Sequence, residues 1–172
     1  IKGSHTRPLK DSVKESIFNV MRHSNFFMPN IEESSILDLY SGIGSFGIEC
    51  ISRGAMDVAF VEKNILVAKV LKENLSNLSI TKKSKIYVDG IENFLKNSLK
   101  KKFDIFFLDP PFAESGFLKI LELIKKKKIF RKDHIVIIHR ENKTNDNFKD
   151  IFNIINVKQY GRSKILFGIS IK

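Results

Sequence analysis

Apolar runs alternate with amphipathic segments along almost the whole chain, and this alternation restricts the possible folds more than any other feature of the sequence. The apolar runs have the length of buried strands, and the segments between the first five of them have the length of crossover helices. The expected strands span residues 36–40, 58–62, 85–88, 103–108, 134–139, 151–160 and 164–170. The expected helices span residues 11–23, 45–53, 65–78, 91–99 and 117–127. The alternation predicts an α/β fold with a mostly parallel sheet.

The last two expected strands are joined only by Gly161-Arg162-Ser163. This connection is too short for a crossover helix, so the two strands are expected to form an antiparallel hairpin. A hairpin after five parallel strands distinguishes the predicted sheet from the all-parallel sheet of a dehydrogenase.

The length of 172 residues fits one domain with its own hydrophobic core. We expect residues 1–172 to form this domain, with residues 1–30 as an N-terminal segment whose helix packs on it. Asp11 is expected to be the N-cap of that helix. The single cysteine, Cys50, excludes an intramolecular disulfide and predicts a buried thiol on an apolar helix face.

The chain is strongly basic, with 30 Lys and Arg residues against 19 Asp and Glu residues and a formal charge of +11. Such a charge attracts polyanions, and nucleic acid is the partner that it favours. The abundance of Lys, Ile, Asn and Phe also fits a coding bias toward A and T. The lysine runs are equally typical of solvated helix ends, where cations complement the helix dipole.

No apolar stretch approaches the roughly 20 residues that span a bilayer, and the chain begins without a signal-peptide pattern. We therefore expect a cytoplasmic protein with no membrane partner. The histidines lack the spacing of metal ligands, so no metal site is expected. They are His5, His23, His134 and His139.

A glycine loop connects the first expected strand to the helix that follows it, and its glycines fit the pattern G-x-G-x-x-G. A dinucleotide site uses such a loop to admit a pyrophosphate, whereas an S-adenosylmethionine site uses it to bring the backbone close to the methionine end of the cofactor. Asp38 ends the strand, where it could receive an ammonium group but would be poorly placed beside a pyrophosphate. The candidate cofactor residues of this loop are Asp38, Tyr40, Ser41, Gly42 and Gly44.

Further acids follow the next two expected strands. Glu62 could accept both ribose hydroxyls, and Asp89 could accept the adenine amino group while Gly90 leaves room for the ring. Lys63 could lay its stem over the adenine face, although an exposed lysine is the ordinary case. Each acid alone could equally be a helix cap or a surface carboxylate. Their joint position at successive strand ends, where open α/β sheets bind ligands, favours a cofactor site.

The sequence Asp109-Pro110-Pro111-Phe112, here named the acceptor turn, directly follows the expected strand 103–108. Consecutive prolines fix φ near roughly −65° and lack backbone N–H groups, so the turn offers only acceptors. Asp109 and the Pro110 carbonyl could hold both hydrogens of an exocyclic amine, while Phe112 stacks on the base. All four residues are candidate catalytic residues, and Phe112 is also a candidate substrate contact. The alternative is a structural turn with an N-capping acid and a core phenylalanine.

These features occur together in one known family. The matching segments are Thr6-Arg7-Pro8 with residues 11–19, the glycine loop 38–44, Glu62 with its preceding strand, and the acceptor turn. On these residues the chain resembles the RsmD-type bacterial 16S ribosomal RNA guanine-N2 methyltransferases over nearly its whole length. The resemblance implies a class I S-adenosylmethionine-dependent methyltransferase fold, which is Rossmann-like and has a mostly parallel seven-stranded sheet ending in an antiparallel hairpin.

The resemblance also implies S-adenosylmethionine as cofactor and, as substrate, a guanine N2 amine of small-subunit ribosomal RNA in a partly assembled small ribosomal subunit. Arg7 is expected to help form the substrate or cofactor rim, or else to be a surface charge. Members of the family usually carry a further basic segment before Thr6, so the resemblance predicts a chain truncated or disordered there. We expect a monomer.

Other functions fit parts of the same pattern. An amino-group methyltransferase acting on transfer RNA, DNA or a protein glutamine would use the same turn. A non-catalytic RNA-binding module with a degenerate methyltransferase fold would need only the basic surface, and the retained acids Asp38, Glu62 and Asp109 argue against it. A nicotinamide dehydrogenase fits less well, because Asp38 disfavours a pyrophosphate and no proton-relay group is visible at a strand end.

Overall fold

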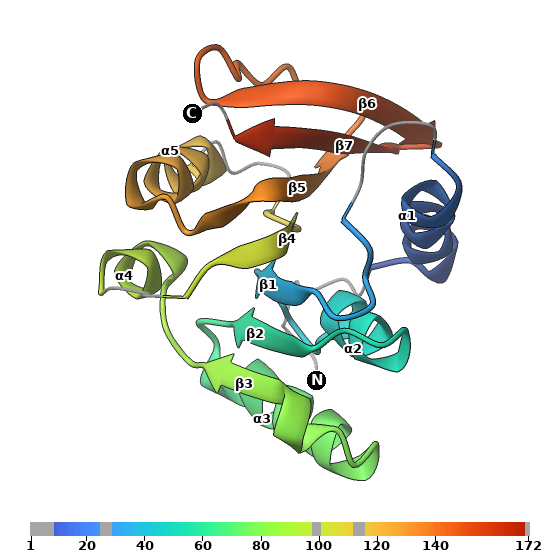
Figure 1. Cartoon of the computed structure of the whole chain (residues 1–172), viewed down its shortest axis with the longest axis vertical. Helices are drawn as coiled ribbons and strands as arrows, with labels where there is room; N and C mark the ends of the chain where they lie inside the picture. The colour runs from blue at the N-terminus through green and yellow to red at the C-terminus, as the bar shows by residue number, and fades with distance from the viewer. Residues whose placement is uncertain (1–8, 25–28, 98–100, 112–115, 171–172) are drawn as a thin grey trace.

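A seven-stranded sheet with the strand order β3-β2-β1-β4-β5-β7-β6 forms the centre of the structure (Figure 1). The structure is a computed structural model that describes residues 9–24, 29–97, 101–111 and 116–170. The strands are β1 Ser35–Leu39, β2 Asp57–Val61, β3 Ser84–Tyr87, β4 Phe103–Leu108, β5 Phe130–Glu141, β6 Phe152–Tyr160 and β7 Ser163–Ser170. The first five strands are parallel, whereas β7 is antiparallel to both β5 and β6. The predicted parallel sheet with a terminal hairpin is confirmed.

Helices cover both faces of this sheet (Figure 1). They are α1 Asp11–His23, α2 Ser45–Ser52, α3 Ile65–Asn77, α4 Ile91–Lys96 and α5 Phe117–Lys127, and a short 3-10 turn, η1 Thr81–Lys83, precedes β3. The first three α-helices lie on one face, and α4 and α5 lie on the other.

Two hydrophobic cores, one on each face, explain why the central strands are apolar without interruption. Successive strand residues point to opposite faces, so Ile36 and Ile105 pack under α1, α2 and α3, while Leu37 and Phe106 pack under α4 and α5. A parallel sheet that is buried on both faces needs apolar residues at every position. The buried Cys50 lies in the first of these cores, as predicted.

Three local predictions differ from the structure. The helix expected over residues 91–99 ends at Lys96, and the last two residues of that expectation lie outside the described residues. The strand expected over residues 134–139 is longer in the structure, where it spans Phe130–Glu141. The prediction is too short because exposed charged residues at the start of the strand and Arg140 near its end interrupt the apolar pattern. Asp11 is not the N-cap of α1: the cap position is Lys10, which makes no side-chain capping bond, and Asp11 is the first helical residue. Its carboxylate instead pairs with Lys14 at 3.2 Å and remains favourable beside the helix N-terminus.

The strand register brings four chain segments together at one edge of the sheet. Leu39 pairs with both Val61 and Leu108, and Leu108 pairs with Ile138. Because these neighbouring strands are parallel, the residues that directly follow each of them meet at the same carboxyl edge. The glycine loop, Glu62 and the acceptor turn are therefore neighbours, as the sequence predicted.

Candidate functional site

The glycine loop has a backbone that most side chains would not tolerate. Gly42 and Gly44 adopt φ of +54° and +89°, and Tyr40 adopts +60° although it is not glycine. The loop is closed by the Ser41 N–H, which donates to the Val61 carbonyl at 3.1 Å, and by the Gly44 N–H, which donates to the Ser41 carbonyl at 2.8 Å. Open space surrounds the position of a Cβ on Gly42. The loop therefore leaves room for a ligand beside its backbone.

Asp38 lies beneath this loop with only 1% of its surface exposed. Its Oδ2 accepts a hydrogen bond of 3.0 Å from the Gly47 N–H in the first turn of α2. Burial raises the pKa of Asp38 to about 8; the Gly47 N–H opposes the rise, and the negative charges of Asp109 and Glu62 add to it. The carboxyl group is thus mostly protonated at neutral pH, and a cation placed beside it would favour its ionised form.

Glu62 is buried directly after β2 and connects the glycine loop to the start of α3. Its Oε2 accepts from the Gly42 N–H at 3.0 Å, and its Oε1 accepts from the Asn64 N–H at 2.7 Å. Asn64 in turn caps α3 by accepting from the Leu66 N–H at 2.9 Å. A carboxylate oxygen can accept more than one hydrogen bond, so Glu62 retains capacity for ligand hydroxyls. Lys63 is exposed.

Asp89 and Gly90 follow β3 at the same edge of the sheet. Asp89 is half-buried, and its two oxygens accept from the Asn93 side-chain amide at 2.9 and 2.8 Å. Gly90 precedes α4, has an extended backbone, and has nothing within 4 Å of the position of a Cβ. This pair therefore combines a fixed acceptor with free space.

The described part of the acceptor turn comprises Asp109, Pro110 and Pro111. Asp109 is half-buried and its Oδ1 lies 2.8 Å from Nδ1 of His139 on β5. The Pro111 carbonyl accepts a hydrogen bond of 3.2 Å from Nη1 of Arg140. Two predicted residues, Phe112 of this turn and Arg7, lie outside the described residues.

The two halves of the predicted site are close enough to interact electrostatically. The charges of Asp109 and Glu62 both raise the pKa of Asp38, so the acid after β4 and the acids around the glycine loop share one environment. Their arrangement can bind a cationic ligand against the loop and present acceptors to a second group beside it.

Sequence reasoning missed His139 and Arg140. The histidine spacing addresses His139 only as a metal ligand, and Arg140 interrupts an apolar strand. The parallel register of β4 and β5 contained a signal for His139, because Leu108 pairs with Ile138 and the next residues are therefore neighbours. For Arg140, whose partner Asp146 lies in the following loop, no such signal was present.

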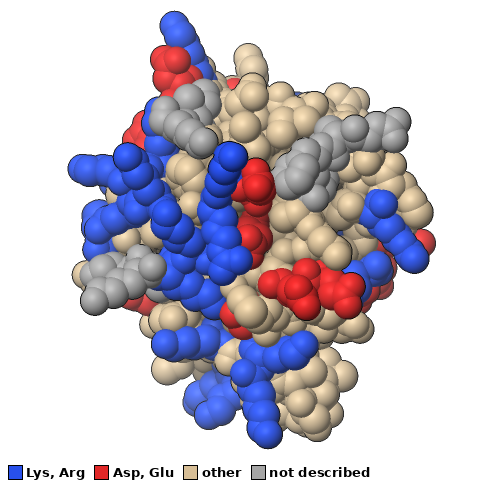
Figure 2. Space-filling view, viewed as in Figure 1, with Lys and Arg blue, Asp and Glu red and all other residues tan. Residues whose placement is uncertain are grey.

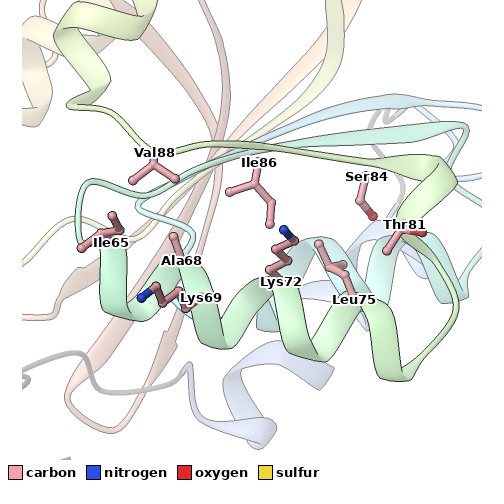
Figure 3. Close-up of a pocket in the computed structure, with 9 residues that line it drawn as sticks. All are labelled: Ile65, Ala68, Lys69, Lys72, Leu75, Thr81, Ser84, Ile86 and Val88. Atoms are coloured by element: carbon pink, nitrogen blue, oxygen red, sulfur yellow. The ribbon is translucent and has the colours of Figure 1, made fainter.

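A hollow of about 410 Å³ lies between α3 and β3, beside the predicted site (Figure 3). Ile65 and Val88 line one end of it, and both are more than half exposed. These residues lie close in sequence to Glu62 and Asp89, respectively. None of the predicted site residues lines the hollow, so its apolar end borders the site but is separate from the acids at the carboxyl edge.

Basic side chains gather on the side of the molecule where α4 and α5 lie, and others gather toward α3 and β3 (Figure 2). Some of them have structural partners: Lys125 Nζ donates to the Asp150 carbonyl at 2.7 Å, and Lys127 Nζ donates to the Lys96 carbonyl at 2.9 Å. Part of the lysine-rich α5 terminus therefore stabilises the fold rather than being free for a partner.

Within the described ranges, no group of three or more His, Cys, Asp or Glu side chains could hold a metal ion. None of the helices in the described part of the chain combines the length and the apolar character needed to cross a membrane.

The strand order, the glycine loop and the acids at the carboxyl edge define a class I S-adenosylmethionine-dependent methyltransferase fold. A solved structure named ribosomal protein L11 methylase, from Lactobacillus delbrueckii subsp. bulgaricus, has the same fold with a TM-score of 0.71 at 15% identity, covering 91% of this chain and 77% of its own. A conserved hypothetical protein of Streptococcus pyogenes superposes with a TM-score of 0.79 at 26% identity, covering 92% and 95% of the two chains.

The family model described as conserved hypothetical protein 95 matches residues 1–169, and the chain belongs to this family, which is the RsmD family. Two relatives carry the name ribosomal RNA small subunit methyltransferase D. The relative from Haemophilus influenzae is 33% identical over 137 residues, covering 78% of this chain and 68% of its own. The relative from Buchnera aphidicola (subsp. Baizongia pistaciae) is 30% identical over 169 residues, covering 98% and 83%. The resemblance stated from the sequence is confirmed.

Proposed function

We propose that this protein transfers a methyl group from S-adenosylmethionine to the exocyclic N2 amine of a guanine in small-subunit (16S) ribosomal RNA. One observation carries the proposal: because Leu39 pairs with Leu108 in parallel strands, the acceptor turn after β4 and the glycine loop after β1 lie at the same edge of the sheet. The relatives named ribosomal RNA small subunit methyltransferase D support the RNA substrate.

The proposed cofactor position follows the order of the strand ends. The methionine part lies against the loop of Tyr40, Ser41, Gly42 and Gly44, with its ammonium group facing Asp38. The ribose hydroxyls face Glu62. These assignments are supported by the open space beside Gly42 and by the spare acceptor capacity of Glu62.

The adenine end of the cofactor is assigned to the ends of β2 and β3. Asp89 accepts from the adenine amino group, and Gly90 leaves space for the ring. The exposed apolar side chains of Ile65 and Val88 provide a surface for the ring, and the exposed Lys63 can cover its face with its stem.

The bound cofactor supplies an electrophilic methyl group, so the protein has mainly to align it with the amine and exclude water. Asp109 and the Pro110 carbonyl hold the two amine hydrogens and direct the nitrogen lone pair. The rigid Pro110-Pro111 backbone keeps these acceptors in place. The target base leaves its stack, and Phe112 stacks on it and offsets part of the unstacking cost. The proton released after transfer passes to Asp109 or to solvent.

The remaining assignments belong to the same proposal. Arg7 lies at the substrate rim, the active unit is a monomer formed by one domain over residues 1–172, and the reaction occurs in the cytoplasm on a partly assembled small subunit.

The test of this function is a transfer assay with labelled S-adenosylmethionine. Purified protein is incubated with small ribosomal subunits from an unmodified strain, and separately with free 16S RNA, transfer RNA, DNA and ribosomal protein. We expect a single N2-methylguanosine in small-subunit RNA, identified by nuclease digestion and mass spectrometry. If the label appears only in transfer RNA, in DNA or in a glutamine side chain, the substrate is an amine of that molecule and not the guanine of small-subunit RNA. If the protein shows no methyl transfer and no cofactor binding, the result would indicate a non-catalytic RNA-binding module.

A further inference from the structure

Two consecutive residues of β5 hold the acceptor turn from opposite faces of the sheet. Ile137 packs into the core under α1, α2 and α3, and Ile138 packs into the core under α4 and α5. Because strand residues alternate between faces, His139 lies on the face of Ile137 and Arg140 on the face of Ile138. Both side chains are buried, with 8% and 2% of their surfaces exposed.

Arg140 holds Pro111 of the acceptor turn while its guanidinium group is itself held by three hydrogen bonds. Its Nε and Nη2 donate to the two carboxylate oxygens of Asp146 at 3.0 and 3.1 Å, and its Nη1 donates to the Pro111 carbonyl at 3.2 Å. The guanidinium also lies over the Phe117 ring, 4.4 Å from its centroid. A planar fork with this many contacts has one orientation, so the Pro111 carbonyl has a fixed position.

His139 holds the near end of the turn. Its Nδ1 lies 2.8 Å from Oδ1 of Asp109. A carboxylate oxygen accepts hydrogen bonds, so we assign Nδ1 of His139 as the donor in this contact. This bond fixes the side-chain rotation of Asp109 and leaves Oδ2 as the oxygen to face a substrate.

We propose that His139 and Arg140 are positioning residues that fix the acceptor turn in the geometry that receives the target amine. Arg140 turns the Pro111 carbonyl toward itself, and the amine hydrogens are assigned to Oδ2 of Asp109 and the Pro110 carbonyl, one acceptor for each hydrogen. His139 sets the direction of the first of these acceptors. This inference rests on the proposed methyl transfer and adds two residues outside the cofactor crevice to it.

The test of His139 compares two substitutions. His139→Leu removes the donor, whereas His139→Asn retains an N–H near the position of Nδ1. Misplaced reacting groups cost up to about 100-fold in rate, so we expect kcat to fall by about 10- to 100-fold in His139→Leu, with KM for S-adenosylmethionine unchanged. His139→Asn is expected to retain kcat within roughly threefold of the wild-type value on the same argument. Equal kcat in the wild type and His139→Leu, or equal losses in both variants, would overturn the role of His139.

His134→Leu is the matched control for this comparison. His134 is also a buried histidine of β5, and its ring contacts the Arg131 carbonyl and the Ser170 N–H, toward the amino end of the strand and away from the acceptor turn. We expect its substitution to lower thermal stability without changing kcat of the remaining folded protein. A fall in kcat as large as that of His139→Leu would show that the effect is general to β5 and would contradict the proposal.

Arg140 needs a double substitution, because removing it alone leaves the buried Asp146 carboxylate without its partner and endangers folding. Arg140→Met with Asp146→Leu removes both charges and the donor to Pro111. We expect a folded protein that binds S-adenosylmethionine like the wild type and has a kcat lower by about 10- to 100-fold. A folded double variant with wild-type kcat would overturn the role of Arg140.

A measurement without substrate separates this inference from the proposed function. In ¹⁵N NMR spectra of the free protein, Nδ1 of His139 is expected to carry a proton, and its signal is expected to move in Asp109→Ala. If this contact is present but the wild type methylates no amine, the proposed function has failed, whereas the contact between His139 and the acceptor turn is still shown. If the wild type methylates RNA and His139→Leu does so equally well, the inference has failed alone.

Discussion

Replacing Asp109 by alanine is expected to lower the rate of methyl transfer by about 10³-fold or more, because the target amine loses an oriented acceptor and a route for its proton. Asp109 directly follows β4 and lies outside the glycine loop. Binding of S-adenosylmethionine is therefore expected to stay within a few-fold of the wild-type affinity. Single-turnover transfer to unmodified small subunits, combined with calorimetric titration of the cofactor, measures both quantities.

Asp133→Ala is the control for this substitution, since Asp133 is an exposed acid at the amino end of β5. It removes one negative charge without touching the carboxyl edge and should leave transfer unchanged. Near wild-type transfer by Asp109→Ala would show that the acceptor turn is not catalytic. If Asp109→Ala loses cofactor affinity as well as methyl transfer, Asp109 is instead a residue of the cofactor site.

Gly47→Ala is expected to lower the free energy of unfolding by about 2 kcal/mol, although alanine favours helices by about 1 kcal/mol over glycine. A Cβ at Gly47 would lie 2.3 and 2.7 Å from ring atoms of Phe60 and 2.8 Å from Cγ1 of Val58. Both side chains are fully buried, so the overlap must be relieved by shifting α2 away from the sheet. The shift would also weaken the hydrogen bond from the Gly47 N–H to Asp38.

Urea unfolding of Gly47→Ala and Gly90→Ala tests this close approach. Gly90 has an extended backbone and open space at its Cβ position, so its substitution should change the free energy of unfolding by at most about 0.5 kcal/mol. A Gly47→Ala protein as stable as the wild type would show that α2 and β2 are less tightly packed than the structure places them.

The fold was predictable because the cores lie on both faces of a parallel sheet. Such a sheet requires uninterrupted apolar strands such as 103–108, and these alternate visibly with amphipathic helices. The short connection after Tyr160 required a hairpin, and the observed turn before Ser163 confirms it. The acids Glu62 and Asp109 were predictable because each directly follows such a strand, and Asp38 because it lies one residue before the end of one.

The partners of the polar side chains at the site were not predictable in the same way. The carboxylates of Asp38 and Glu62 accept backbone N–H groups of the glycine loop and its helix, which their positions in sequence do not reveal. The partner of the buried Arg140 is Asp146, which returns to it from a loop. The cap of α1 was assigned one residue late, since Asp11 is favourable both as a cap and in the first helical turn.

Proton-linked binding of S-adenosylmethionine tests most directly whether a cationic methyl donor occupies the acid-lined crevice. Asp38 has a pKa raised to about 8, so at pH 7 most of this group is protonated in the free protein. An ammonium group against it lowers that pKa and expels the proton, so the affinity should rise as the pH increases from about 6 to 8. In the Asp38→Asn variant this proton release should be absent.

The measurement is isothermal titration of the cofactor at pH 7 in buffers with different enthalpies of ionisation. We predict binding at one site with release of most of one proton by the wild type. Absence of binding, or binding without proton release, would contradict a donor site against Asp38 beside the acceptor turn.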